Sequence, residues 1–309
     1  MKKYIICGLI AISQYAMSQD PVITTTTTST PPPQTPPTGV PTSSSVYGPT
    51  VNNGVYTPEH LPLRKPIPYV PLREADVIWS KRVWRVIDLR EKINQPLYYP
   101  TSDIAKRPSL FTIIQKGIIS QELTAFDPEP SVFDPDEEFK IEYTSAAAQK
   151  VLVREVSILK QDTLTGEMTP VTVPDTIKPD DVVQYWLKED WFFDKQRSIM
   201  DVRILGIAPV VENRDDKGDF KGPKALFWIY YPACRNYFAK YQCYNPYNDA
   251  EWRTFDEVFH KRLFSSFIKE ESNVYNRPIA AYSQGIDNLL ESDRIKDDIF
   301  KLEHDMWNF

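Results

Sequence analysis

The alternation of apolar and polar residues is clearest between Val182 and Pro232, where it predicts strands. From Val183 onward every second side chain is apolar, which is the period of a strand with one buried face. The same period returns over Met200–Val210. Ala225–Tyr231 is apolar or aromatic throughout, so we expect it to be covered on both faces. A polar, glycine-containing connection before this last run predicts a hairpin.

Together these runs predict a central antiparallel sheet over about Val182–Tyr231. Pro209 lies inside the second run, and a proline has no N–H to donate to a neighbouring strand. We therefore expect this part of the run to be an edge or the end of the strand.

Outside the sheet, apolar residues recur at helical spacing and predict amphipathic helices that pack against it. In Arg73–Ile93 the stripe is formed by Val77, Trp84 and Ile87. The fold class expected is therefore α+β, in a single globular domain over residues 71–309. The other expected helices are Pro108–Glu122, Trp252–Lys269 and Tyr282–Asn308.

Two stretches are less regular. Ala146–Glu155 suits a helix, but its end from Val151 to Val153 also suits a strand. Gln161–Pro179 is polar and contains three prolines, so we expect a loop.

In Trp252–Lys269 the expected inward residues are Phe255, Phe259, Leu263 and Phe267. In the last helix they are Ile286, Leu289, Leu290, Ile295, Ile299, Leu302 and Met306, with Lys296, Asp297, Asp298 and Glu303 in water.

The first 18 residues have the pattern of a signal peptide. Lys2 and Lys3 precede a short apolar core, and Ala16-Met17-Ser18 suits cleavage before Gln19. The alternative is a buried first helix. Cys7 lies too early for a lipid attachment site, and the apolar run is too short to span a bilayer. We expect an exported, unanchored protein of the periplasm.

Residues 19–70 form a Thr/Pro-rich leader. Between Pro21 and Pro71 lie 13 of the 27 prolines, so we expect a disordered or polyproline-like tether. Its second half regains apolar residues, among them Leu61, Ile67 and Tyr69. This extended arm, about Thr57–Leu72, has two possible sites: a neighbouring protein or its own domain.

The charge balance narrows the class of partner. The formal net charge is −6, and removal of residues 1–18 takes away two lysines and no acid, which brings it to −8. A mildly acidic surface without basic runs argues against nucleic acid or an anionic membrane as a general partner.

Cys234 and Cys243 are the only cysteines after residue 18. In an oxidising compartment such a pair can form a disulfide. The alternative is two buried thiols, and the spacing does not decide, because a disulfide requires a particular geometry. No short Cys/His pair accompanies them, so we expect no zinc site.

Two groups of carboxylates could suggest chemistry. Asp190 and Asp194 are four positions apart on an expected strand, too far to cooperate, so we expect ion pairs instead. Their expected partners are Lys195, Arg197 and Arg203. The acidic stretch Phe126–Phe139 lacks the ligand spacing and glycine of a calcium loop, so we expect a solvated loop. Its carboxylates are Asp127, Asp134, Asp136, Glu137 and Glu138.

The remaining pattern points away from an enzyme. Hydrolase, metalloprotease, phosphate-loop and dinucleotide motifs are all missing, and only 10 glycines occur. The histidines are scattered, so we expect surface or hydrogen-bonded side chains and no catalytic, cofactor or metal site. They are His60, His260 and His304.

Four blocks of the sequence resemble one family. DWFFDKQRS begins at Asp190, RILGIAPV at Arg203 and LFWIYYPACR at Leu226, and a longer block covers Arg73–Pro100. They resemble the GldN/PorN family, periplasmic components of the type IX secretion and gliding motility machinery. The likeness covers nearly all of the chain after the signal peptide.

The resemblance implies a function that the residues alone do not reach. It implies a non-enzymatic component that forms a ring with the outer-membrane lipoprotein GldK/PorK, self-associates within it, and contacts the inner-membrane motor protein GldM/PorM. Through these partners it would lie at the inner side of the outer membrane. The alternative is a free periplasmic enzyme or ligand-binding protein that acts on envelope polymers.

Overall fold

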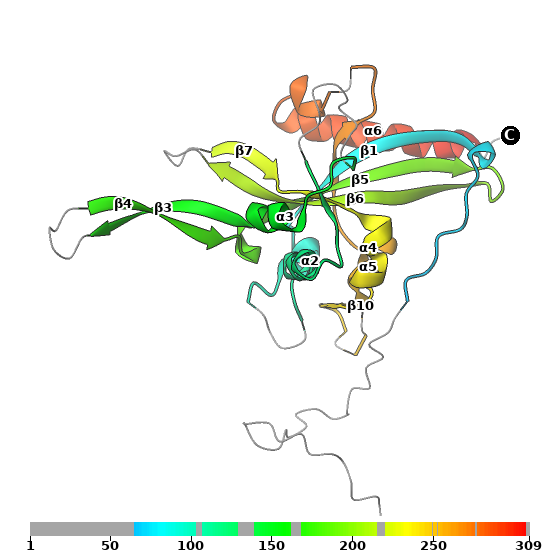
Figure 1. Cartoon of the computed structure of the whole chain (residues 1–309). Helices are drawn as coiled ribbons and strands as arrows, with labels where there is room; N and C mark the ends of the chain where they lie inside the picture. The colour runs from blue at the N-terminus through cyan, green and yellow to red at the C-terminus, as the bar shows by residue number, and fades with distance from the viewer. Residues whose placement is uncertain are drawn as a thin grey trace, which may run out of the picture. The chain divides into compact units, whose positions relative to one another are not determined.

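A computed structural model of the chain places an antiparallel sheet at its centre (Figure 1). The structure describes residues 65–102, 107–128, 139–161, 168–214, 220–248, 250–251, 253–275 and 277–306. The strand order is β11-β1-β5-β6-β8-β2, with β7 also paired to β6. The strands are β1 (Val77–Asp88), β2 (Ala125–Phe126), β5 (Val182–Asp194), β6 (Ile199–Arg214), β7 (Phe220–Ala225), β8 (Trp228–Tyr230) and β11 (Phe267–Glu271).

The α+β class with a central antiparallel sheet is therefore confirmed. Helices α2 (Leu110–Ile119) and α6 (Ile286–Met306) lie within the ranges expected for them. Strands β6 and β7 pair antiparallel, as the hairpin prediction requires, but β7 includes residues 220–224 of the stretch expected to be the connection. The run Ala225–Tyr231 is buried except at Tyr230. The smaller elements are α1 (Gln95–Tyr98), α3 (Ser145–Val151), α4 (Tyr231–Phe238), α5 (Phe255–His260), β9 (Gln242–Cys243) and β10 (Arg253–Thr254).

The helix expected over Arg73–Ile93 is wrong: the stretch forms strand β1. This strand lies between β5 and β11, and all residues from Val83 to Ile87 are buried. A strand covered on both faces is apolar at nearly every position, so helical spacing arises within it by chance. The β-branched and aromatic content of VWRVI was the better signal.

The long helix expected over Trp252–Lys269 is also wrong, because it ends early. Helix α5 stops at His260, and Arg262 takes a positive φ of 54°. The chain then turns, and Phe267–Glu271 pairs with β1 as an edge strand. Phe255 and Phe259 are buried as expected, but Leu263 is exposed and Phe267 is half-buried, so their expected inward positions were wrong. Strand β11 buries Ile268 instead.

The loop expected over Gln161–Pro179 is wrong where residues 168–176 form strand β4. It pairs with β3 (Val153–Gln161) in a two-stranded ribbon that extends away from the main sheet (Figure 1). Each strand of a two-stranded ribbon has one edge without a neighbouring strand, and prolines are tolerated at such an edge. The helix and strand readings of Ala146–Glu155 both hold, since α3 ends at Val151 and β3 begins at Val153.

Pro209 does not end its strand. Strand β6 continues to Arg214, but its second neighbour changes from β8 to β7 near this proline. Pro209 accepts a bond from the N–H of Leu226 at 3.0 Å and needs to donate none there. The proline therefore lies at the break between two partner strands.

Two clusters cover opposite faces of the sheet. Tyr185 and Leu187 of β5 pack with α2, α4 and α5 in the larger core. Trp186 lies between them in the strand and so points to the other face, where it packs with Trp84 and Trp228. A third cluster joins α6 to β1 and β11, through Ile295, Ile299, Val83, Ile268 and Ile279.

Gly117 in α2 tests how tightly the larger core is packed. A Cβ there would lie 2.5 Å from Leu123 Cδ1 and 2.9 Å from Tyr237 Cε1. Alanine favours a helix over glycine by about 1 kcal/mol, but overpacking costs about 1–3 kcal/mol. We therefore expect Gly117→Ala to lower the free energy of unfolding, measured by urea denaturation.

The matched control is Ala146→Gly, at an exposed position of α3. It measures the helix-propensity difference without a clash, which is about 1 kcal/mol. A Gly117→Ala protein more stable than the unmodified chain would contradict the close packing.

Candidate interaction surfaces

Tyr69, in the arm before the first strand, lies between two arginines. The guanidinium carbon of Arg235 is 4.2 Å from the centre of the Tyr69 ring, and that of Arg203 is 5.2 Å from it. The His260 ring centre lies 6.2 Å from the same point. A cation over an aromatic face contributes up to about 2 kcal/mol when desolvated. The arm therefore packs on its own domain at Tyr69, while residues 57–64 lie outside the described part of the chain.

A buried ion pair fixes Arg235. Its Nε and Nη2 donate to the two oxygens of Asp256 at 2.8 and 3.2 Å, and both side chains are buried. Tyr231 Oη also donates to Asp256, at 2.9 Å. Burial, and next the Asp256 carboxylate, raises the pKa of Tyr231 above its ordinary value. The edge of the guanidinium is thus occupied by Asp256, which leaves its face for Tyr69.

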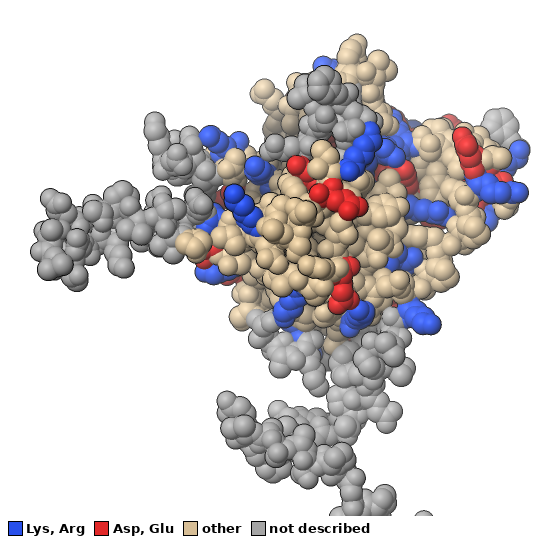
Figure 2. All heavy atoms as spheres, in the orientation of Figure 1, with Lys and Arg blue, Asp and Glu red and all other residues tan. Residues whose placement is uncertain are grey.

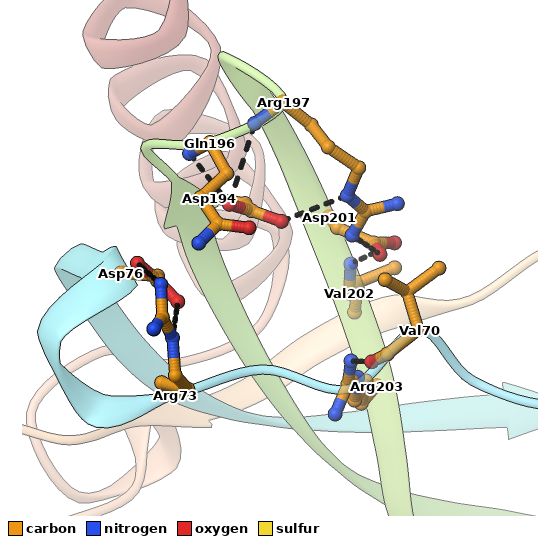
Figure 3. A network of polar contacts seen from close by, with 9 residues as sticks. All are labelled: Val70, Arg73, Asp76, Asp194, Gln196, Arg197, Asp201, Val202 and Arg203. Atoms are coloured by element: carbon orange, nitrogen blue, oxygen red, sulfur yellow. Dashed lines mark hydrogen bonds and ion pairs between the residues drawn. The ribbon is translucent and has the colours of Figure 1, made fainter.

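Further along, the arm is tied to the start of β1 and the β5–β6 turn (Figure 3). Arg203 donates to the carbonyl oxygen of Val70. The Lys195 N–H donates to the carbonyl oxygen of Asp76 at 2.9 Å. Arg73 pairs with the Asp76 side chain at 2.8 Å, and this hydrogen bond lowers the pKa of the carboxyl group.

The β5–β6 turn is itself held by a carboxylate. Asp194 accepts from the Gln196 N–H at 2.8 Å and from Arg197 Nε at 2.7 Å (Figure 3). The bond from Arg197 is the largest cause that lowers the pKa of Asp194. The expected pairing of Asp194 with Arg197 is confirmed. Asp190 pairs instead with Arg82 of β1, at 2.8 and 3.1 Å, so its expected partners were wrong.

Helix α6 has a second apolar side that faces away from the core. Ile286 and Leu290 are 77% and 61% exposed, and Leu289 beside them is exposed as well. Positions three and four apart are neighbours on a helix surface, so these residues form one patch. We call Ile286, Leu289 and Leu290 the α6 patch.

The expected inward position of the α6 patch was therefore wrong. Ile295 and Ile299 are buried as expected, and Ser292 shares their side and accepts from the Ile268 N–H at 2.7 Å. Helical spacing shows that a side is apolar, but not that a neighbour covers it. Lys296, Asp297 and Asp298 face water as expected, whereas Glu303, Leu302 and Met306 are half-buried.

The segment before α6 adds further exposed apolar surface. Val274 is 96% exposed, and Tyr275 is also exposed. The Arg277 guanidinium lies 4.9 Å from the ring centres of both Tyr275 and Tyr282, and Tyr282 donates to Glu291 of α6. This segment is therefore tied to the start of α6 by its tyrosines.

The charge distribution does not suggest a nucleic-acid site. On the face shown in Figure 2, Lys and Arg are mixed with Asp and Glu around a broad area without charge. Among the described residues, no helix is both long and apolar enough to cross a membrane. Nor do those residues include three or more His, Cys, Asp or Glu side chains grouped to hold a metal ion.

A polar cavity of about 740 Å³ borders the base of the β3–β4 ribbon. Arg154 in its wall pairs with Asp181 and with Asp175, at 3.5 Å each. These charges satisfy one another, which makes the cavity a weak candidate for a site that binds a charged ligand. Its other charged lining residues are Asp127, Lys150, Asp180, Glu212 and Lys224.

Cys234 of α4 and Cys243 of β9 are free, buried thiols in the structure. Cys243 donates weakly to the Pro96 carbonyl oxygen at 3.5 Å. A disulfide between them is not formed there and stays a prediction. His260 and His304 are exposed, while His60 and the carboxylates Asp134, Asp136, Glu137 and Glu138 lie outside the described residues.

The arginine–tyrosine contact was not found from the sequence. Tyr69 stood out only as one apolar residue of the arm, and its partners lie more than 130 positions away. The one available signal was the block LFWIYYPACR, whose Arg235 follows an apolar run. A charged residue that continues a buried segment requires a partner.

Removal of the Tyr69 ring should release the arm. Without it the cation–aromatic contacts, which contribute about 2 kcal/mol, are lost. This loss corresponds to about a 30-fold rise in the equilibrium constant for local opening of the arm. We expect Tyr69→Ala to speed native-state trypsin cleavage after Arg73 by about that factor. Mass spectrometry of the peptide that begins at Glu74 measures the rate.

Tyr69→Phe keeps the ring and should cleave at the unmodified rate. Tyr275→Ala, which removes an exposed tyrosine elsewhere, should also leave the rate unchanged. Equal cleavage of the Ala, Phe and unmodified chains would show that the contact does not hold the arm.

The two thiols should be protected until the chain unfolds. Burial raises the pKa of Cys234 and of Cys243 to about 12, so both are protonated at neutral pH. In an exported chain that begins at Gln19, we expect no rapid reaction with Ellman's reagent when folded. In guanidinium without reductant, two reacting thiols per chain would show the free cysteines of the structure, and none would establish the predicted disulfide.

Comparison with known families identifies the chain. A family model described as gliding motility associated protein GldN matches residues 72–308. Among curated proteins, none matches. The matched range begins at Leu72, within the tied end of the arm, and takes in the whole sheet and α6. The chain belongs to the GldN family of gliding motility associated proteins.

Proposed function

We propose that this protein is a non-enzymatic structural component of the gliding motility and type IX secretion machinery in the periplasm. Membership of the GldN family supports the link to gliding motility. The expected signal peptide, residues 1–18, supports export. The exposed apolar surface on a chain with mixed surface charge supports a role in protein–protein contact.

In this proposal the protein forms a ring with a GldK/PorK-like outer-membrane lipoprotein and contacts a GldM/PorM-like motor protein. It has no membrane span of its own in this role, and the lipoprotein holds it at the inner side of the outer membrane. A closed ring needs two different surfaces on each subunit, one for each neighbour. The lipoprotein requires a surface besides these.

The α6 patch is the observation that carries the proposal. Full burial of a leucine or isoleucine side chain contributes about 1.5–3 kcal/mol. Three such side chains lie together and exposed on one side of a helix whose other side is already buried. We assign this patch to the contact with the lipoprotein.

Introduction of a charge tests this contact. Leu290→Glu would bury a carboxylate in an apolar interface, which is strongly unfavourable. We expect this variant to lose at least tenfold in affinity for the lipoprotein, measured by co-purification and by light scattering after size exclusion. Its urea midpoint should stay unchanged, because Leu290 contributes little to the core.

Ile119→Glu is the matched control, since Ile119 is also an exposed aliphatic residue in a helix, at the end of α2. It should bind the lipoprotein normally. If Leu290→Glu also binds with full stoichiometry, the α6 patch is not the contact. If the unmodified chain does not bind the lipoprotein at all, the proposed function fails.

A further inference from the structure

A second apolar surface lies at another place on the domain. A groove of about 740 Å³ is formed between α1, the β9–β10 pair and the end of α5. Its wall is largely apolar and aromatic, and Tyr247 is 85% exposed. The lining residues that matter here are Ile93, Pro96, Tyr99, Tyr244, Tyr247 and Leu263.

The chemistry of this groove fits a proline-rich strand of polypeptide. Tyrosine and proline rings on a shallow surface bind polyproline II segments, because these pay little conformational entropy on binding. The lining residues include Lys92 and Arg253 and no acid, although Arg253 pairs with Glu251 outside the lining at 3.1 Å. An occupant with basic residues would therefore be disfavoured.

The chain carries a segment of that chemistry. Thr30–Pro41 reads TPPPQTPPTGVP, with six prolines and no charge. The second proline-rich stretch of the leader, Thr57–Leu72, contains Arg64 and Lys65 and is tied down at Tyr69. Of the two, the uncharged segment fits better a groove whose lining holds Lys92 and no acid.

The length of the leader allows it to reach the groove of a neighbouring copy. The arm already contacts α5 at His260, and Val258 and Leu263 of the same region line the groove. The 23 residues between Pro41 and Lys65 can reach at most about 80 Å, at about 3.3–3.6 Å per fully extended residue. That reach exceeds the roughly 45 Å width of a domain of this size.

We propose that the Thr30–Pro41 segment of one copy binds the Tyr244–Tyr247 groove of the next copy. This inference rests on the proposed function, because it supplies one of the two subunit–subunit contacts that a ring requires. The leader then acts as a strap between neighbouring subunits, and α6 remains for the lipoprotein.

Photo-crosslinking in mixed rings tests the strap. A mature chain with Tyr247→p-benzoylphenylalanine is mixed with a tenfold excess of ¹⁵N-labelled chain, and the lipoprotein is added to form the complex. After illumination, mass spectrometry identifies the attached peptide. We expect a ¹⁵N-labelled peptide that contains residues 30–41.

Every other product overturns the inference. An unlabelled leader peptide would show that each leader binds its own groove. A peptide of the lipoprotein, or none from the leader, would show that the groove has another occupant or stays free. The same crosslinker at Tyr275 should capture no leader peptide, which controls for random contact.

A second variant separates this contact from the proposed function. Tyr244→Ala should lower the yield of the leader crosslink at least fivefold, whereas Leu290→Glu should leave it unchanged in subunit oligomers. A chain that binds the lipoprotein but shows no leader crosslink refutes the strap alone. An unmodified chain that crosslinks but does not bind the lipoprotein refutes the proposed function and leaves the contact between copies standing.

Discussion

The buried ion pair between Arg235 and Asp256 is the constraint on which the helical layer and the arm both depend. It joins α4 to α5 across the core, and Tyr231 completes the hydrogen bonding of the carboxylate. Either charge alone would be buried without compensation, which costs about 3–5 kcal/mol. The pair therefore holds two short helices in one arrangement that their apolar contacts alone would define less sharply.

The same pair determines where the leader departs from the domain. Because Asp256 occupies the edge of the Arg235 guanidinium, Tyr69 can stack on its face, and Arg203 of β6 holds the ring from a second direction. A segment with few neighbours of its own is thus fixed by contacts with β6, α4 and α5. The leader therefore leaves the domain at a fixed point, and the distance that it can reach is measured from there.

The sequence predicts the parts of this fold that are governed by local pattern. Alternation located β5 and β6, and the fold class and α2 followed from spacing. It failed at β1, because a strand buried on both faces loses its alternation. It failed at α5, because the left-handed turn at Arg262 has no strong local signal. Contacts such as Tyr69 with Arg235 join distant positions, and no local pattern records them. The sequence contained the two cysteines but did not decide whether they form a disulfide.

The failed expectation for α6 is the most informative for function. Its spacing was apolar on two sides, and the fold buries only the side that carries Ile295 and Ile299. A helix that leaves an aliphatic side in water is tolerated if another protein covers it, since such patches otherwise favour aggregation. The groove at Tyr244 and Tyr247 is a separate surface built by different elements. Two dissimilar apolar surfaces on one subunit suit an assembly in which each neighbour is of a different kind.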